Sequence, residues 1–169
     1  LEHGVLDVTS GTAALTIDVK VKGLYILGMG AGNQRPQINF NTIGSATFRI
    51  AATTGAGCYL YNIRTTCTVA ALVTAFVVAA ADVTFDTVDF YDDGTNDCTN
   101  WAAITGINCT IKNCFHTSIV TQTATLNWIT LNAAQGFRCY NNSFYIAGKS
   151  SGNPANGILV GITTLTKYV

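Results

Sequence analysis

Cys58-Tyr-Leu-Tyr-Asn62 has a pattern that recurs four more times along the chain. In each copy the first and third residues are apolar, and the fifth is small or carries an amide. Successive copies start 34, 25, 26 and 28 residues apart. A short β-strand that returns at such intervals indicates a solenoid, in which stacked coils bury a continuous core. The five copies cover residues 24–28, 58–62, 83–87, 109–113 and 137–141.

A second strand-like segment precedes each copy, and β-branched and aromatic residues are frequent in both. The short turns between the two segments contain Gly, Ala and Asn, which permit tight corners. We expect a long loop after the second strand to return the chain to the next coil. The sequence therefore predicts an all-β solenoid of about five coils, in a single domain over residues 1–169. The preceding segments are 15–19, 48–50, 75–78, 102–104 and 129–131.

The composition is apolar and almost uncharged: 49% of the residues are hydrophobic, 11% are charged, and the net charge is zero. This balance argues against nucleic-acid binding, which requires a basic surface. The most apolar run, 69–83, is too short for a membrane-spanning helix. So few charges suggest that neighbouring chains cover part of the surface. Because the chain starts at Leu1 and ends within a strand-like run, we expect it to be part of a longer polypeptide.

The six cysteines lack the spacing of a zinc site, since there is no Cys-x2-Cys pair and the chain has only two histidines. Cys58, Cys109 and Cys139 fall at inward positions of the repeat, where a thiol packs as a small hydrophobic group. Three others lie beyond or between the strands, so that loop disulfides stay open as an alternative. These are Cys67, Cys98 and Cys114.

Six of the nine acidic residues lie between Asp82 and Asp97. Oxygen ligands in the turn Tyr91-Asp-Asp-Gly-Thr-Asn-Asp97 suggest a Ca²⁺ site, or a carboxylate pair for glycoside hydrolysis. The turn lacks the full spacing of a calcium loop, and a solvated or inter-subunit acidic edge is the favoured interpretation. We predict no catalytic residue and no cofactor. The weak metal candidates are Asp92, Asp93 and Asp97.

Two outward columns follow from stacking the repeated strands about 4.8 Å apart. The first column reads Tyr25, Tyr59, Thr84, Thr110 and Arg138, and the second reads Leu27, Tyr61, Asp86, Lys112 and Tyr140. Tyrosines mixed with an aliphatic residue, an arginine and a charge pair are typical of protein interfaces. A sugar-binding face and an ordinary half-exposed sheet face remain alternatives. The predicted interface residues are Tyr25, Leu27, Tyr59, Tyr61, Arg138 and Tyr140.

The glycine-rich stretch Gly28-Met-Gly-Ala-Gly32 superficially matches a phosphate-binding loop. A dinucleotide-binding loop requires a helix to open at its third glycine, whereas the residues that follow have no helical pattern. The stretch is therefore predicted to form a tight corner of the solenoid. We expect the loop over residues 34–45, which contains Arg35 and Pro36, to contact a neighbouring subunit.

The pattern apolar-x-apolar-x-Asn, followed two or three residues later by Phe115 or Phe144, resembles the right-handed parallel β-helix of pectate lyases and phage tailspikes. Residues 19–36, together with Asn113-Cys-Phe115, are similar to β-helix proteins of tailed-phage structural gene clusters. The resemblance implies a virion component.

On that basis we expect a non-enzymatic virion structural protein, displayed on the particle surface as a bacteriophage capsid decoration or spike protein. We expect it to be a homotrimer whose partners are the major capsid protein or other virion proteins. The alternative is a phage tailspike, or a secreted β-helix, that binds or cleaves polysaccharide.

Overall fold

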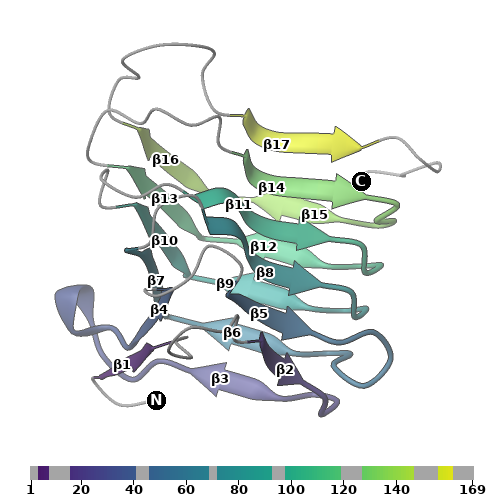
Figure 1. The fold of residues 1–169 in the computed structure, drawn as a ribbon, viewed down its shortest axis with the longest axis horizontal. Helices are drawn as coiled ribbons and strands as arrows, with labels where there is room; N and C mark the ends of the chain where they lie inside the picture. Colours follow the sequence, from purple (N-terminus) through teal and green to yellow (C-terminus); the bar gives the residue numbers. More distant parts are fainter. Residues whose placement is uncertain are drawn as a thin grey trace.

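The computed structural model describes residues 4–7, 16–40, 46–68, 72–92, 98–118, 127–146 and 156–161. Over these residues the chain is all-β apart from one short 3₁₀ turn, η1 (Gly32–Gln34). Every strand pairs in parallel with the strand one coil away, so the molecule is a parallel β-helix (Figure 1). The described residues include no helix long and apolar enough to cross a membrane.

Three sheets form the walls of the solenoid. Sheet A contains β1 (Val5–Asp7), β4 (Gln37–Phe40), β7 (Arg64–Cys67), β10 (Asp89–Asp92), β13 (Phe115–Ser118) and β16 (Ser143–Ile146). Sheet B contains β2 (Thr16–Val19), β5 (Thr47–Ile50), β8 (Leu72–Val78), β11 (Cys98–Ile104), β14 (Asn127–Asn132) and β17 (Asn156–Gly161). Sheet C contains β3 (Tyr25–Leu27), β6 (Tyr59–Tyr61), β9 (Thr84–Asp86), β12 (Thr110–Lys112) and β15 (Arg138–Tyr140).

The chain passes through sheets B, C and A in turn, and from β2 to β16 it completes five such triplets. The predicted solenoid of about five coils is therefore confirmed, and the repeated pattern corresponds to sheet C. The prediction of a long return loop in each coil was wrong, because that part of the coil contains a strand of sheet A. In particular, the predicted loop over 34–45 contains β4, whose Ile38 and Phe40 are fully buried. Residues 41–45 lie outside the described part of the chain.

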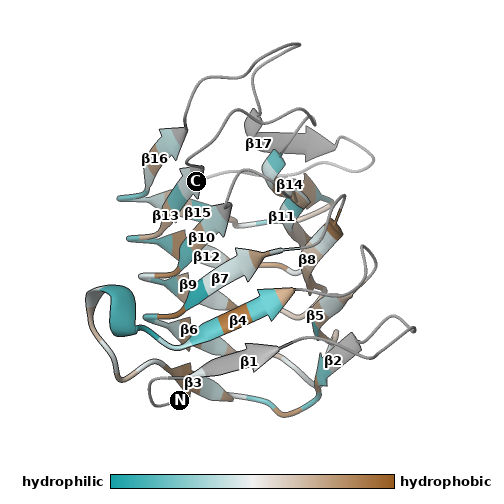
Figure 2. Ribbon diagram, turned by 60° about the vertical axis from the view of Figure 1, so that its left-hand side comes forward, coloured by the Kyte–Doolittle hydropathy of each residue, from teal (hydrophilic) through white to brown (hydrophobic). Residues whose placement is uncertain are grey.

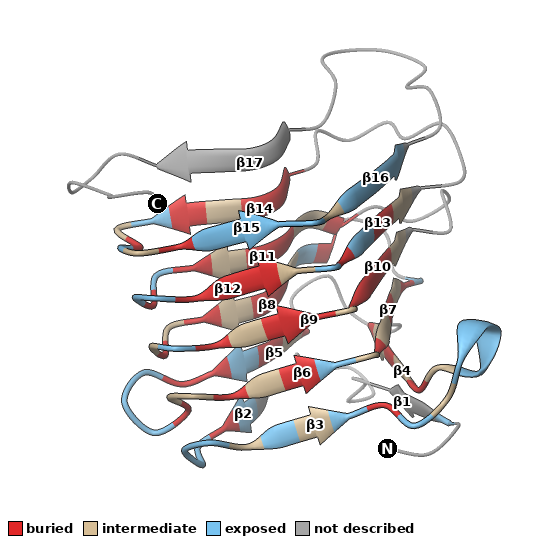
Figure 3. Cartoon of the chain, turned by 180° about the vertical axis from the view of Figure 1, so that it is seen from behind, coloured by how far each residue is buried: buried red, intermediate tan, exposed pale blue. Residues whose placement is uncertain are grey.

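Aromatic side chains from all three walls fill the middle of the solenoid. Phe76 of β8 packs against Phe48 of the coil below, and edge-on against Phe40, Phe85 and Phe90. Burying one such ring contributes about 1.5–3 kcal/mol to folding. Figure 3 shows that buried residues concentrate in the middle coils, whereas β3 and β15, the end strands of sheet C, are largely exposed.

A left-handed residue follows each of the last four strands of sheet C. Asn62, Thr87, Asn113 and Asn141 have φ between 54° and 56°, a region that asparagine tolerates better than most residues. The asparagines of the repeated pattern therefore stack at one left-handed corner. Asn62 Nδ2 donates to the carbonyl oxygens of Gly28 and Gly30, and Asn113 Nδ2 donates to Asp86 Oδ1, in each case in the preceding coil.

No disulfide joins any of the six cysteines, which excludes the loop disulfides in this structure. Burial raises the pKa of Cys58 and Cys109 to about 11 and that of Cys114 to about 12. These thiols are neutral at pH 7 and pack as apolar groups. Cys139 occupies the inward column, in register with Ile111, but it is exposed, since β15 is the last strand of sheet C among the described residues. Its predicted burial was therefore wrong.

Replacing Phe76 by alanine is expected to lower the free energy of unfolding by about 3–5 kcal/mol, since a fully buried ring would leave a cavity among four others. Urea denaturation followed by circular dichroism measures the loss. Val73→Ala, at an exposed position of the same strand, should cost less than about 1 kcal/mol. Equal losses in the two variants would contradict the described core.

Candidate functional site

The outer face of sheet C carries the two columns predicted from the sequence. Tyr25, Tyr59, Thr84, Thr110 and Arg138 are in register, and so are Leu27, Tyr61, Asp86, Lys112 and Tyr140. Five of the six predicted interface residues are exposed, and Tyr59 is half-buried. They form two groups. One occupies β3 and β6, and the other, Arg138 and Tyr140, lies on β15 at the opposite end of the sheet.

The first group contains a row of tyrosine rings. The Tyr25 and Tyr59 rings stack with their centroids 5.4 Å apart and their planes inclined by 26°. Tyr59 and Tyr61 lie 6.5 Å apart at the same inclination. Tyr25 is 64% exposed and Tyr61 is 41% exposed, so the row has a large solvent-facing surface. Leu27, in register with Tyr61, extends it with an aliphatic side chain.

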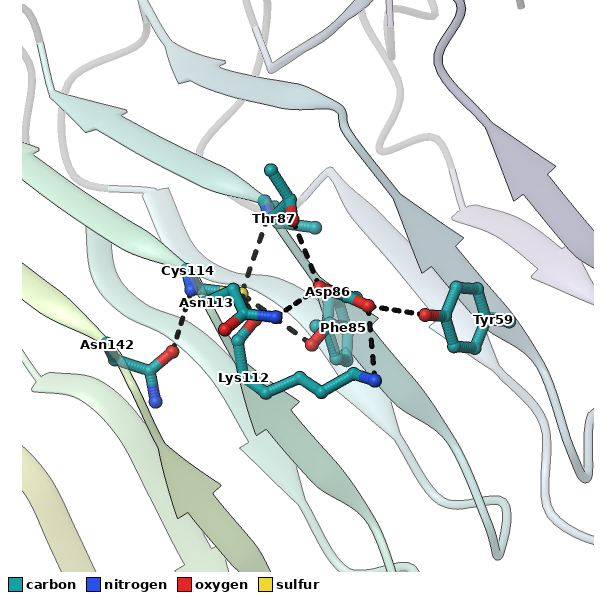
Figure 4. A network of polar contacts seen from close by, with 9 residues as sticks. Tyr59, Phe85, Asp86, Thr87, Lys112, Asn113, Cys114 and Asn142 are labelled. Atoms are coloured by element: carbon teal, nitrogen blue, oxygen red, sulfur yellow. Dashed lines mark hydrogen bonds and ion pairs between the residues drawn. The ribbon is translucent and has the colours of Figure 1, made fainter.

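A buried carboxylate fixes the middle of the face (Figure 4). Tyr59 Oη donates a 2.5 Å hydrogen bond to Asp86 Oδ2, and Lys112 Nζ lies 3.2 Å from the same oxygen. Asn113 Nδ2 and Thr87 Oγ1 donate to Asp86 Oδ1 at 2.9 and 3.0 Å. Both oxygens are therefore bonded, and strands β6, β9 and β12 are joined through one side chain. The predicted Asp86–Lys112 pair is confirmed.

These contacts determine the charge state of the network. Burial by itself would raise the pKa of Asp86, but the hydrogen bonds from Tyr59, Asn113, Lys112 and Thr87 outweigh it and lower that pKa. The hydrogen bond to Asp86 raises the pKa of Lys112, and burial together with the same carboxylate raises the pKa of Tyr59. At neutral pH the site consists of a carboxylate, an ammonium group and a neutral phenol. This charge state stabilises the network and makes Asp86 a poor proton donor.

The predicted metal candidates lie largely outside the described residues. Asp92 ends β10, and nothing is described of its side chain, while Asp93 and Asp97 fall in a segment that is not described. Within the described ranges, no group of three His, Cys, Asp or Glu side chains could hold a metal ion. Of the other acidic residues in this region, Asp86 faces outward on sheet C and Asp89 is paired with Arg64 on sheet A, at 2.9 Å.

A second feature lies on sheet A, where sequence reasoning predicted only loops. A pocket of about 230 Å³ is bounded by the η1 segment and by the outer face of this sheet. Two arginines, Arg35 and Arg64, contribute to its wall. The sequence signals near it were the glycine-rich stretch that ends at Gly32 and the Arg35-Pro36 pair. The pocket could not be predicted from these signals alone, because its wall is formed by β7, β10 and β13, and the pairing of these strands brings its residues together.

Comparisons with protein-family models, with curated proteins and with solved structures find no match to this chain. The function therefore has to be inferred from its own residues and geometry.

The Asp86→Asn variant is expected to be destabilised by about 1–3 kcal/mol at pH 7, because it removes charge-assisted hydrogen bonds from Tyr59 and Lys112. Chemical denaturation measures the effect. Asp18→Asn, which breaks surface ion pairs with Lys20 at 3.5 Å and with Arg49 at 3.7 Å, is the matched control and should cost less than about 1 kcal/mol.

The same variant should change the pH dependence of stability. The folded pKa of Asp86 lies below its ordinary value of 3.8, so its contribution is present above pH 3.8 and is lost as the pH falls through the folded pKa. We expect the wild type to lose more stability than Asp86→Asn below pH 3.8, measured by denaturation at a series of pH values. If the stabilities of the two proteins fell in parallel below pH 3.8, Asp86 would not be bound in the folded state by the contacts described.

Proposed function

We propose that this chain is a non-enzymatic structural protein of a virion, displayed on the capsid surface as a decoration or spike protein. It assembles as a homotrimer through the outer face of sheet C. The major capsid protein or other virion proteins are its further partners. The observation that carries the proposal is the exposed tyrosine row on β3 and β6.

The tyrosine row has the composition of the centre of a protein interface. Tyr25, Leu27 and Tyr61 expose 64%, 41% and 41% of their surface, and they belong to two adjacent coils. Aromatic residues are enriched at interfaces because a rigid ring buries a large area with little loss of conformational freedom. Single exposed apolar residues are ordinary, whereas a contiguous row of them marks an interaction surface.

The charged groups of the face support assembly rather than catalysis. Asp86 is held ionised by four donors, whereas a general acid for glycoside cleavage needs a raised pKa. Lys112 of the same chain neutralises the charge of Asp86, so a partner chain does not have to supply a cation to this carboxylate. The resemblance of residues 19–36 to phage β-helix proteins supports the virion location.

The variant Tyr25→Ser/Tyr61→Ser tests the assembly. Wild-type chain at micromolar concentration is expected to have the mass of three chains by light scattering after size-exclusion chromatography, and the double variant the mass of one. Val73→Ser, at a 59% exposed apolar position on sheet B, should retain the trimer. A monomeric wild type, or a trimeric double variant, would refute the role given to sheet C.

The location is tested by a cryo-electron microscopy reconstruction of the particle that contains the chain. Density for a β-helix repeated over an icosahedral shell is the expected result. Density confined to a tail tip or fibre would contradict capsid decoration and favour receptor binding.

Polysaccharide binding is the second candidate, and the exposure of the same tyrosines favours it. Tyr25 and Tyr61 are 64% and 41% exposed on adjacent coils, and exposed aromatic rings can pack against sugar rings. If this function is correct, the wild type binds a polysaccharide on a glycan array and the Tyr25→Ser variant does not. Shortening of a bound polysaccharide by the wild type would add cleavage to that function.

A further inference from the structure

The pocket on sheet A lies between an overhanging segment and a flat wall. Its overhang consists of Gly32, Asn33 and Arg35, in and next to η1, and its wall is formed by side chains of β7, β10 and β13. Figure 2 shows η1 as a hydrophilic turn that projects from the molecule just before the start of β4. The wall residues are Arg64, Asp89, Phe115 and Thr117.

The wall is built by the register of sheet A. Arg64, Asp89 and Phe115 occupy the same position on three successive strands. Arg64 Nε donates a 2.9 Å hydrogen bond to Asp89 Oδ2, and its guanidinium lies 5.0 Å from the centroid of the Tyr91 ring. Thr117 Oγ1 donates a 3.4 Å hydrogen bond to Asp89 Oδ1. Arg64 is thus fixed by an ion pair and an aromatic ring, while its charge is balanced by Asp89.

Arg35 is different, because no described carboxylate pairs with it. Its Nε atom is buried and has no hydrogen-bond partner in the structure. Its guanidinium carbon lies 5.9 Å from the centroid of the Phe115 ring, on the far wall of the pocket. A buried donor without a partner is costly, and few occur in native proteins. Because this Nε is out of reach of solvent, a ligand in the pocket would meet the other nitrogens of the guanidinium, for which no carboxylate partner is described.

The backbone around Arg35 holds it over the pocket. The amide of Arg35 donates to the carbonyl oxygen of Gly32, which closes the 3₁₀ turn. Asn62 Nδ2 bonds the Gly28 and Gly30 carbonyl oxygens to the next coil. A side chain at Gly30 would collide with the backbone of Gln34, so only glycine allows this close return. The glycine-rich stretch therefore acts as the support of the overhang.

The charges that line the pocket, on the overhang and the wall together, indicate the kind of ligand. Two guanidinium groups and one carboxylate leave the lining with one net positive charge, which matches a monoanion better than a dianion. Guanidinium groups bind carboxylates through paired N–H donors. The exposed face of Phe115 offers an apolar wall, and the volume of about 230 Å³ limits the ligand to a small molecule or a single side chain.

We propose that this pocket binds a carboxylate group, with Arg35 as its main donor. The carboxylate belongs either to a small organic acid or to a residue of a neighbouring chain. The site lies on sheet A and is independent of the tyrosine row on sheet C, so it adds a second recognition surface to the proposed function.

Titration with benzoate tests the proposal on the whole chain. Benzoate is expected to bind saturably, in calorimetry, and to shift the NMR signals of the Arg35 and Arg64 Nε–H groups. Its neutral counterpart benzamide should bind at least about tenfold more weakly, because it loses the charge-assisted hydrogen bonds. The proposal would be overturned if benzoate bound saturably to neither the dissociated nor the assembled protein and if Arg35→Gln had the same oligomer mass as the wild type. Tighter binding of sulfate than of benzoate would also overturn it.

Two arginine variants distinguish binding in the pocket from a general attraction of benzoate to positive charge. Arg35→Gln is expected to weaken benzoate binding at least about tenfold by removing the guanidinium. Arg49→Gln removes an exposed arginine from sheet B and should leave the affinity unchanged. Equal losses in the two variants would overturn the role of Arg35.

Light scattering on the same proteins identifies the source of the carboxylate. If the ligand is a small organic acid, Arg35→Gln loses benzoate binding and keeps the oligomer mass of the wild type. If a neighbouring chain supplies the carboxylate, Arg35→Gln also lowers the oligomer mass, and benzoate binds only the dissociated wild type. Either result supports the pocket, and neither depends on the outcome for Tyr25→Ser/Tyr61→Ser.

Discussion

Parallel pairing in one fixed register along sheet C is the constraint on which the other features of this structure depend. Each of its strands has three residues, and the central one points inward to the core. A shift of one residue would turn Leu60, Phe85 and Ile111 outward and Asp86 inward. The same register places Asp86 between Tyr59 and Lys112, and it brings Tyr25 beside Tyr59. The core, the carboxylate network and the tyrosine row therefore have a common cause.

The left-handed corner residues help to maintain this register. Asn62 and Asn113 end their strands at φ near 55° and bond to the preceding coil, which limits sliding along the strand. Thr87 occupies the same corner although β-branched residues rarely adopt this conformation. Its hydroxyl bonds to Asp86, so here the carboxylate network contributes to the corner in place of an amide.

Sheets B and C could be predicted from the sequence, because β-branched and aromatic residues are frequent in both and, in sheet C, an apolar inward residue lies between two outward ones. Sheet A could not, since its inward positions include Thr65 and His116, both buried in the solenoid. A polar residue at an inward position removes the alternation that identifies a strand. The outward columns of sheet C were predictable for the same reason that its strands were. The pairing of Arg64 with Asp89 and the overhang of Arg35 required strands that the pattern did not reveal.

The register of sheet C can be measured through interstrand nuclear Overhauser effects on isotope-labelled protein in solution. We expect backbone contacts that pair Leu60 with Phe85 and Phe85 with Ile111, together with side-chain contacts from Tyr59 to Lys112 across Asp86. Contacts displaced by one residue, pairing Leu60 with Asp86, would contradict this register. The same displacement would remove the structural basis for both the carboxylate network and the tyrosine row.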